Sequence, residues 1–81
     1  MQITVTFINK QNSIDLLIDN MQKIKDTLRT VEEAEILPDF EWESAYYVKS
    51  LRMNRRLSVF CSYEEAGIYS GDILEICDID I

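Results

Sequence analysis

The stretch EEAGIYSGDILEI, residues 64–76, decides the fold of this chain. Residues 64–66 predict a single helical turn, and Gly67 suits the left-handed residue that ends such a turn. The Ser-Gly-Asp sequence at residues 70–72 is typical of a second turn. Residues 73–77 then predict a short strand, with Leu74 and Ile76 on one face. A short strand near the end of the sequence needs a partner strand that has already formed. We therefore expect it to pair beside the first strand, at the centre of a small mixed sheet.

The N-terminal segment has the pattern of that partner strand. Apolar and β-branched residues alternate along it with period two, which predicts a strand with one buried face. The polar residues 9–13 separate it from a second short apolar run, residues 14–18, and this arrangement predicts a hairpin. The alternating apolar residues of the first strand are Met1, Ile3, Val5 and Phe7, and those of the second are Ile14, Leu16 and Ile18.

One amphipathic helix is expected after the hairpin. Asp19 followed by Gln22 resembles a capping box, so the helix should begin at Asp19 or Asn20. Because isolated helices of this length are marginal, its apolar stripe has to be buried, and Leu28→Asp should unfold the domain. The helix should end near residues 33–35. The stripe at helical spacing consists of Met21, Ile24, Leu28 and Val31.

The rest of the chain completes an α+β pattern. Residues 45–51 predict a third strand and residues 57–60 a fourth, joined by the basic turn at residues 52–56. We therefore expect one domain over residues 1–81, with one helix packed across one face of a mixed sheet of four to five strands. The first and last strands should be adjacent and parallel.

Composition excludes several function classes. The formal net charge is −7 and the pI is about 4.3, so a nucleic acid would be repelled. The chain has no His, the commonest general base, and two Cys without His cannot complete a usual zinc site. We expect no catalytic residue, cofactor or metal. The start shows no signal peptide and no apolar run is long enough for direct membrane insertion, so a cytoplasmic protein with free thiols is expected.

The segment from Glu32 to Glu43 holds six acids and no Lys or Arg, together with Phe40 and Trp42. One interpretation is a solvated connection whose two aromatic rings cover the edge of the core. The other is an acidic and aromatic contact site for a basic partner.

A basic cluster is the most informative surface feature of the sequence. Lys49, Arg52, Arg55 and Arg56 are half of the 8 Lys and Arg residues, within eight consecutive positions. They are either a solvated hairpin turn or a docking patch for an acidic or membrane-proximal partner, with aromatic anchors beside them. Alternation along the third strand predicts Tyr47 and Leu51 as the exposed pair and Lys49 facing solvent. The candidate partner-binding residues are Tyr47, Lys49, Leu51, Arg52, Arg55, Arg56 and Phe60.

Three parts of the chain resemble the ubiquitin-like β-grasp family. The start MQITV is similar to the opening strand of ubiquitin, and the ILPD step at residues 36–39 resembles its turn after the helix. The ending GDILEI, residues 71–76, resembles the YukD/EsaB group of ubiquitin-like proteins. These proteins accompany WXG100-type (type VII) secretion systems of Gram-positive bacteria.

The resemblance implies a non-catalytic, cytoplasmic protein-interaction module that is an accessory or regulator of such a secretion machine. Its partners would be protein components of the machine at the membrane. The sequence has no C-terminal Gly-Gly, so conjugation to targets is not expected, and Glu75 lies where ubiquitin has part of its apolar recognition patch. Two alternatives stay open, namely a β-grasp sulfur-carrier or tagging protein and a small redox protein that uses Cys61.

Overall fold

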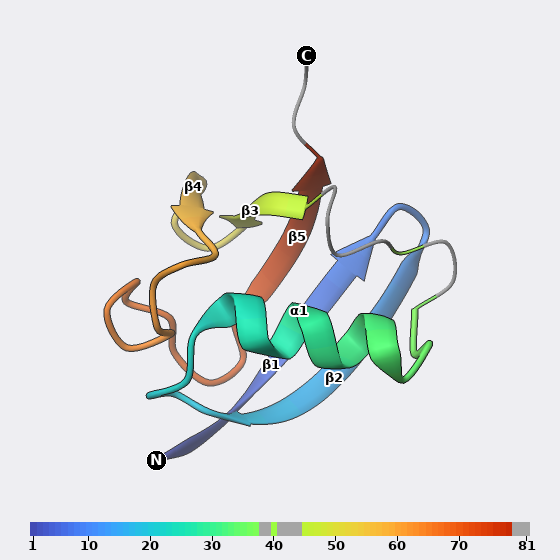
Figure 1. Ribbon diagram of the computed structural model, residues 1–81. Helices are drawn as coiled ribbons and strands as arrows, with labels where there is room; N and C mark the ends of the chain where they lie inside the picture. The colour runs from blue at the N-terminus through green and yellow to red at the C-terminus, as the bar shows by residue number, and fades with distance from the viewer. Residues whose placement is uncertain (38–39, 41–44, 79–81) are drawn as a thin grey trace.

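The computed structural model describes residues 1–37, 40 and 45–78. They form two layers, a five-stranded sheet and a single helix that crosses one of its faces (Figure 1). The strands are β1 (Gln2–Asn9), β2 (Asn12–Asp19), β3 (Ala45–Ser50), β4 (Arg55–Ser58) and β5 (Ile73–Asp78), and the helix is α1 (Ile24–Glu33). The predicted α+β architecture is confirmed.

The closing strand lies where the sequence predicts it. The sheet order is β2-β1-β5-β3-β4, so β5 occupies the centre. β5 pairs parallel with β1 on one side and antiparallel with β3 on the other. Its Leu74 and Ile76 are buried beneath the helix layer, whereas Ile73 and Glu75 lie on the opposite, outer face. The pairing of the two ends of the chain therefore holds the sheet together.

The hairpin between β1 and β2 is tighter than the five polar residues suggest. Asn9 pairs with Asn12, so that only Lys10 and Gln11 form the loop. Lys10 has a φ of 58°, in the left-handed region that two-residue hairpin turns require. The alternation in β1 is confirmed for Ile3, Val5 and Phe7, but Met1 precedes the strand and is 80% exposed.

The helix begins later than predicted, at Ile24, and the predicted cap at Asp19 is wrong. The Asp19 carboxylate accepts a hydrogen bond from the Met21 N–H at 2.9 Å, which forms a turn before the helix. Backbone carbonyls from the segment after β4 satisfy the first helical donors instead. The Ile24 N–H donates to the Cys61 carbonyl at 3.0 Å and the Lys25 N–H to the Val59 carbonyl at 2.8 Å. Tertiary contacts thus replace the side-chain cap.

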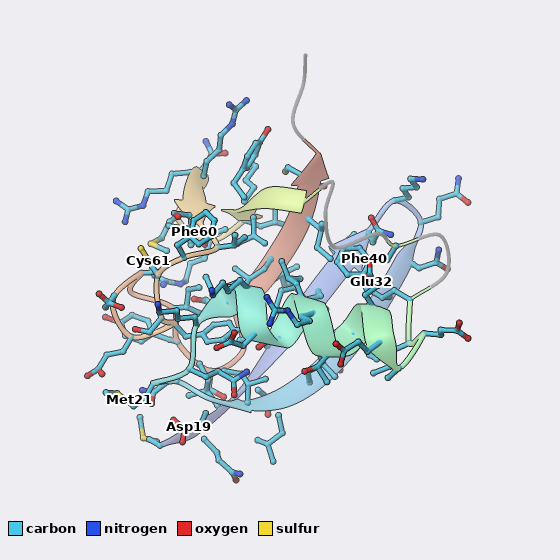
Figure 2. All side chains as sticks on the ribbon, in the orientation of Figure 1. Asp19, Met21, Glu32, Phe40, Phe60 and Cys61 are labelled. Carbon is cyan, nitrogen blue, oxygen red and sulfur yellow. The ribbon has the colours of Figure 1, made fainter. Side chains whose placement is uncertain are left out.

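The later start changes the buried stripe. Met21 is 64% exposed and points away from the sheet, so it does not belong to the stripe (Figure 2). Ile24, Leu28 and Val31 are buried as predicted, and Thr27 joins them. The Thr27 hydroxyl accepts hydrogen bonds from the buried Tyr63 hydroxyl at 2.7 Å and from the Gln22 amide at 2.6 Å. This network allows a polar residue to lie under the helix.

The segment before β5 contains the two predicted turns. Ser62 and Glu65 form a reciprocal capping box, in which the Ser62 N–H donates to the Glu65 carboxylate at 3.0 Å and the Glu65 N–H to the Ser62 hydroxyl at 3.1 Å. The hydrogen bonds from Ser62 hold the pKa of Glu65 below its usual value. Gly67 and Gly71 have φ values of 75° and 94°, which explains glycine at both turns.

Part of the acidic connection lies outside the described residues. Phe40 is described and is 9% exposed, so its ring closes the edge of the core next to the helix (Figure 2). Trp42 lies outside the described residues. The burial of Phe40 favours the interpretation in which an aromatic side chain covers the core edge.

Candidate functional site

The seven predicted partner-binding residues do not form one patch. The structure places six of them in three environments, namely a half-buried ion pair at the turn after β3, the outer face of β3 and β4, and the N-terminal end of α1. The seventh, Arg55, lies on the other face of β4. Their burial, charge and neighbours differ, so each environment is described separately.

Arg52 is an anchor and not a free cation. Its Nε and one terminal nitrogen donate to the two oxygens of Asp72 at 2.6 and 3.0 Å, and the same terminal nitrogen donates to the Gly67 carbonyl at 2.7 Å. Its guanidinium also lies 4.7 Å from the centre of the Tyr69 ring. Arg52 therefore joins the turn after β3 to the segment before β5. Because Asp72 is only 4% exposed, we expect Arg52→Glu to disturb the fold.

The carboxylate that receives Arg52 is held in its charged form. Burial alone would raise the pKa of Asp72, but hydrogen bonds from Arg52 and from the Tyr69 N–H outweigh it, so that the pKa lies below its usual value. The hydrogen bond to Asp72 in turn raises the pKa of Arg52. The pair is thus a structural clamp, since the Asp72 carboxylate and two of the three Arg52 nitrogens already form hydrogen bonds within the chain.

A second arginine lies on the outer face of the sheet, away from α1. Arg56 pairs across the strands with Lys49, and Lys49 pairs with Glu75 of β5. The Arg56 guanidinium lies 4.8 Å from the centre of the Tyr47 ring. Tyr47 and Lys49 are half-buried by these neighbours, and Arg56 is exposed. Cross-strand neighbours share a face, so this row presents two cations, one carboxylate and one aromatic ring to solvent.

Apolar side chains adjoin that row. Leu51 follows β3 and is 43% exposed, and its N–H donates to the carbonyl of Ile73, whose side chain is 38% exposed. Ile8 pairs with Glu75 and is half-buried. We call this region the outer-face patch; it consists of Ile8, Tyr47, Lys49, Leu51, Arg56, Ile73 and Glu75. The patch combines aliphatic side chains with an aromatic ring and an arginine, and aromatic residues and arginine are enriched in protein interfaces.

Besides Arg52, two predicted residues lie outside the outer-face patch. Arg55 is exposed, but it pairs with Ser50, a residue of the buried face of the sheet. Arg55 and Arg56 therefore lie on opposite faces of β4. Phe60 follows β4 and is 59% exposed, and the Lys25 ammonium of the helix lies 5.8 Å from its ring centre. Figure 2 shows Phe60 beside Cys61 near the start of α1. Proximity in the sequence therefore does not bring Phe60 to the outer face.

Two cysteines lie among the described residues. Cys61 and Cys77 are both partly buried and form no disulfide within the described residues, and Cys61 packs against the core. Among the described residues, no group of three or more His, Cys, Asp or Glu side chains could hold a metal ion. Within the same residues, no helix has both the length and the apolar character that crossing a bilayer requires.

Comparison with known proteins gives a structural likeness without a sequence match. No protein-family model and no curated protein sequence matches the chain. Ubiquitin from Caldiarchaeum subterraneum superposes with a TM-score of 0.72 at 12% identity, covering 100% of this chain and 98% of that one. The chain has the ubiquitin-like fold. At such low identity the likeness establishes the fold alone.

Two further structures agree with this assignment. A designed protein based on ubiquitin superposes with a TM-score of 0.75 at 16% identity, covering 99% of this chain and 92% of that one. The ubiquitin-like domain of Plasmodium falciparum Dsk2 gives a TM-score of 0.69 at 20% identity, covering 95% of this chain and all of the other. The β-grasp fold inferred from the sequence is therefore confirmed.

Two groups of structural residues around the candidate site are missing from the sequence-based expectation. Asp72 has the sequence signature of a turn residue only, and its pairing with Arg52 spans 20 positions, so no local pattern reports it. Ser62 and Glu65 have the S-x-x-E spacing of a capping box, which is a signal that the sequence does carry. The ion pair depends on the topology, whereas the capping box can be recognised from spacing alone.

Proposed function

We propose that this ubiquitin-like chain is a single, non-catalytic protein-interaction module that docks through its outer-face patch. The observation that carries the proposal is the row in which Arg56 covers Tyr47 while Lys49 lies between Arg56 and Glu75. These cations lie on a chain of net charge −7, so they mark a local site for a partner with exposed carboxylates. Leu51 belongs to the same patch, whereas Arg55 lies outside it.

The resemblance of the ending GDILEI to YukD/EsaB proteins supports a finer proposal. The module is a cytoplasmic accessory of a type VII (WXG100) secretion system in a Gram-positive bacterium, and its partner is a protein component of that machine at the membrane. It acts by binding and is not conjugated to targets. Arg52 and Phe60, both predicted as contact residues, are not needed by this version of the site.

A charge-reversal experiment tests the docking surface. Lys49→Glu with Arg56→Glu should abolish co-purification with the membrane component of the secretion machine, while the circular dichroism spectrum stays unchanged. The matched control, Lys23→Glu with Arg29→Glu, makes the same charge change on exposed residues of the other layer and should leave binding intact. Equal recovery with both double variants would reject the outer-face patch.

The cellular role needs a separate readout. Deleting the gene should reduce secretion of a WXG100 substrate, and the outer-face variant should fail to restore it while the control variant succeeds. Incubation with ATP and an activating enzyme should leave the mass of the protein unchanged. A covalent adduct would contradict non-conjugation, and undiminished secretion would contradict the secretion role without affecting the docking surface.

A further inference from the structure

The basic turn continues into β4 as the sequence RRLSV, residues 55–59. Two arginines stand three and two positions before a serine, and an apolar residue follows the serine. Serine kinases that select their substrates by charge recognise arginines at this spacing. Ser58 therefore has the sequence signature of a phosphorylation site, and the structure shows whether the segment is accessible.

Ser58 lies at an edge of the sheet. β4 is the last strand in the order β2-β1-β5-β3-β4, and within the described residues it pairs with β3 alone (Figure 1). Arg55, Arg56 and Ser58 are all exposed, whereas Leu57 and Val59 are buried. A kinase binds its substrate segment in an extended conformation, which an edge strand already has. The folded chain therefore presents both arginines and the serine in the conformation that a kinase binds.

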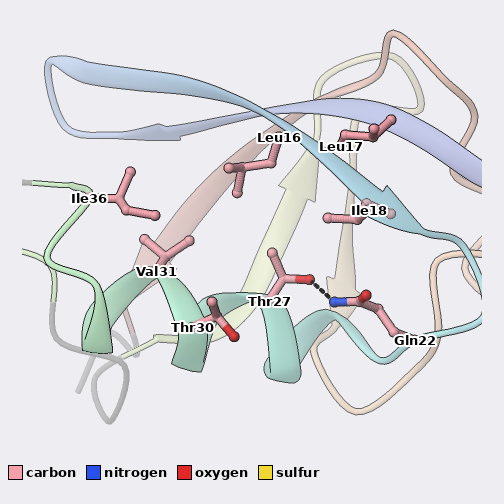
Figure 3. A pocket seen from close by; sticks show the side chains of 8 residues that line it. All are labelled: Leu16, Leu17, Ile18, Gln22, Thr27, Thr30, Val31 and Ile36. Carbon is pink, nitrogen blue, oxygen red and sulfur yellow. Dashed lines mark hydrogen bonds between the residues drawn. The ribbon is translucent and has the colours of Figure 1, made fainter.

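Other exposed hydroxyl groups lack this combination. Among the described residues the exposed serines besides Ser58 are Ser13 and Ser70, and neither has an arginine two or three positions before it. Thr30 comes directly after Arg29, but it lies in α1, where its hydroxyl donates to a backbone carbonyl of the preceding turn at 3.0 Å. Figure 3 shows Thr30 on the helix, among the residues that line a pocket between α1 and β2. Sequence and conformation thus agree at Ser58.

Ser58 adjoins the outer-face patch. It pairs across the strands with Tyr47, and it shares a face with Arg56 because residues two apart along a strand point the same way. The Arg56 guanidinium lies 4.8 Å from the centre of the Tyr47 ring, so it extends over the residue that pairs with Ser58. Within the described residues no carboxylate forms an ion pair with Arg56. A phosphate on Ser58 would therefore lie beside this guanidinium.

We propose that an arginine-directed serine kinase phosphorylates Ser58, and that the phosphate pairs with Arg56 and closes the outer-face patch to acidic partners. The site of phosphorylation and its pairing with Arg56 depend on this chain alone. The effect on partners rests on the proposed function of the patch.

The transfer uses the hydroxyl group of Ser58. In the folded chain its oxygen accepts a hydrogen bond from the Phe60 N–H at 3.2 Å, a contact that does not use the hydroxyl proton. The oxygen forms a bond to the γ-phosphorus of Mg²⁺-bound ATP, the bond from that phosphorus to its bridging oxygen breaks, and ADP leaves with the electron pair. The hydroxyl proton passes to a carboxylate base of the kinase.

The phosphate changes the charge of the outer face. Phosphoserine carries a charge of about −1.5 to −2 near pH 7, which offsets the two cations Lys49 and Arg56. A guanidinium forms two parallel hydrogen bonds with a phosphate, and this pair is stronger than the stacking of an exposed arginine on a ring. Arg56 therefore leaves the Tyr47 ring, and the carboxylates of a partner meet an anion in place of a cation.

The modification is tested on the folded chain with Mg²⁺-ATP and the catalytic subunit of cyclic-AMP-dependent protein kinase, which is arginine-directed. The mass should increase by one phosphoryl group, and fragmentation should place this group on Ser58. Ser58→Ala should prevent the increase, whereas Ser70→Ala should not. Arg55→Gln with Arg56→Gln should slow the transfer about tenfold or more. No transfer, phosphate on another residue, or an unchanged rate in the double variant would overturn the site.

The ion pair is tested by the titration of the phosphate. Phosphorus NMR of the phosphorylated chain should give a second phosphate pKa below the usual value of about 6, because Arg56 stabilises the dianion. Arg56→Gln, phosphorylated to completion by longer incubation, should bring this pKa back to about 6. The matched change Arg29→Gln on α1 should leave it low. Equal values in the native chain and in Arg56→Gln would reject the pairing.

Co-purification separates the regulation from the proposed function. The phosphorylated chain should lose the membrane component of the secretion machine, while kinase-treated Ser58→Ala should retain it. Equal recovery with phosphorylated and unmodified chains would overturn the regulation. Failure of the unmodified chain to co-purify would overturn the docking and with it the regulation, whereas the mass and titration results decide on Ser58 and Arg56 independently.

Discussion

Two arginine–tyrosine pairs with nearly the same geometry have different roles in this molecule. Arg52 lies 4.7 Å from the Tyr69 ring centre and Arg56 lies 4.8 Å from that of Tyr47. Arg52 also binds the carboxylate of Asp72, which is 4% exposed, whereas among the described residues no carboxylate forms an ion pair with Arg56. The buried carboxylate, and not the stacked ring, makes an arginine structural.

The largest expected effect in this comparison is that of Arg52→Ala. It removes both hydrogen bonds to Asp72 and the one to the Gly67 carbonyl, and leaves a buried carboxylate without its cation. Leaving the Asp72 carboxylate unpaired should lower the free energy of unfolding by about 1–3 kcal/mol, toward the lower end because Arg52 is itself 43% exposed and solvent screens the pair. Urea denaturation followed by circular dichroism measures this loss.

A double-mutant cycle shows whether this loss comes from the ion pair. Arg52→Ala with Asp72→Ala should cost less than the sum of the two single changes, because no unpaired buried carboxylate remains. If the two single losses simply add, Arg52 acts through its contacts with Gly67 and Tyr69, and the contrast with Arg56 would need another cause.

Acid stability gives a second difference between the two pairs. The pKa of Asp72 is lower in the folded chain than in the unfolded one, so its stabilising contribution is complete above the unfolded value of about 3.9 and is lost as the pH falls through the folded pKa. Arg52→Ala should weaken this acid-induced loss, because burial then raises the pKa of Asp72. Arg56→Ala should preserve it. Unfolding curves from about pH 7 to pH 3 would show the difference, and parallel losses in both variants would contradict it.

The sequence predicted the strands well because burial in this sheet follows local alternation. Val5 and Phe7 in β1, and Leu74 and Ile76 in β5, have period-two positions that turned out to be buried. The central parallel pairing followed from the shortness of the last strand. A local sequence pattern is sufficient to predict which residues are buried wherever the same layer covers one face of an element along its whole length.

The sequence did not predict features that depend on distant backbone. The start of α1 is set by carbonyls of Val59 and Cys61, which belong to the segment after β4, so Asp19 was a misleading capping signal. The basic cluster predicted a single patch because the sequence does not show which distant residues the fold places beside each arginine. Its members lie apart in the structure. The fold places the Asp72 carboxylate next to Arg52, whereas the position of Arg56 follows from the alternation of β4.

The smallest expected effect on stability is that of Arg56→Ala. An exposed guanidinium over an aromatic ring contributes little, so the loss should stay below about 1 kcal/mol and the unfolding midpoint should hardly change. The matched change Arg52→Ala should be clearly larger in the same assay. A large loss at Arg56 would mean that the outer-face patch is part of the fold. We expect Arg56→Ala to weaken partner binding with little loss of stability, and Arg52→Ala to lower stability with little effect on binding. These two results together would establish that an arginine stacked on a tyrosine marks a contact surface only where no buried carboxylate binds that arginine.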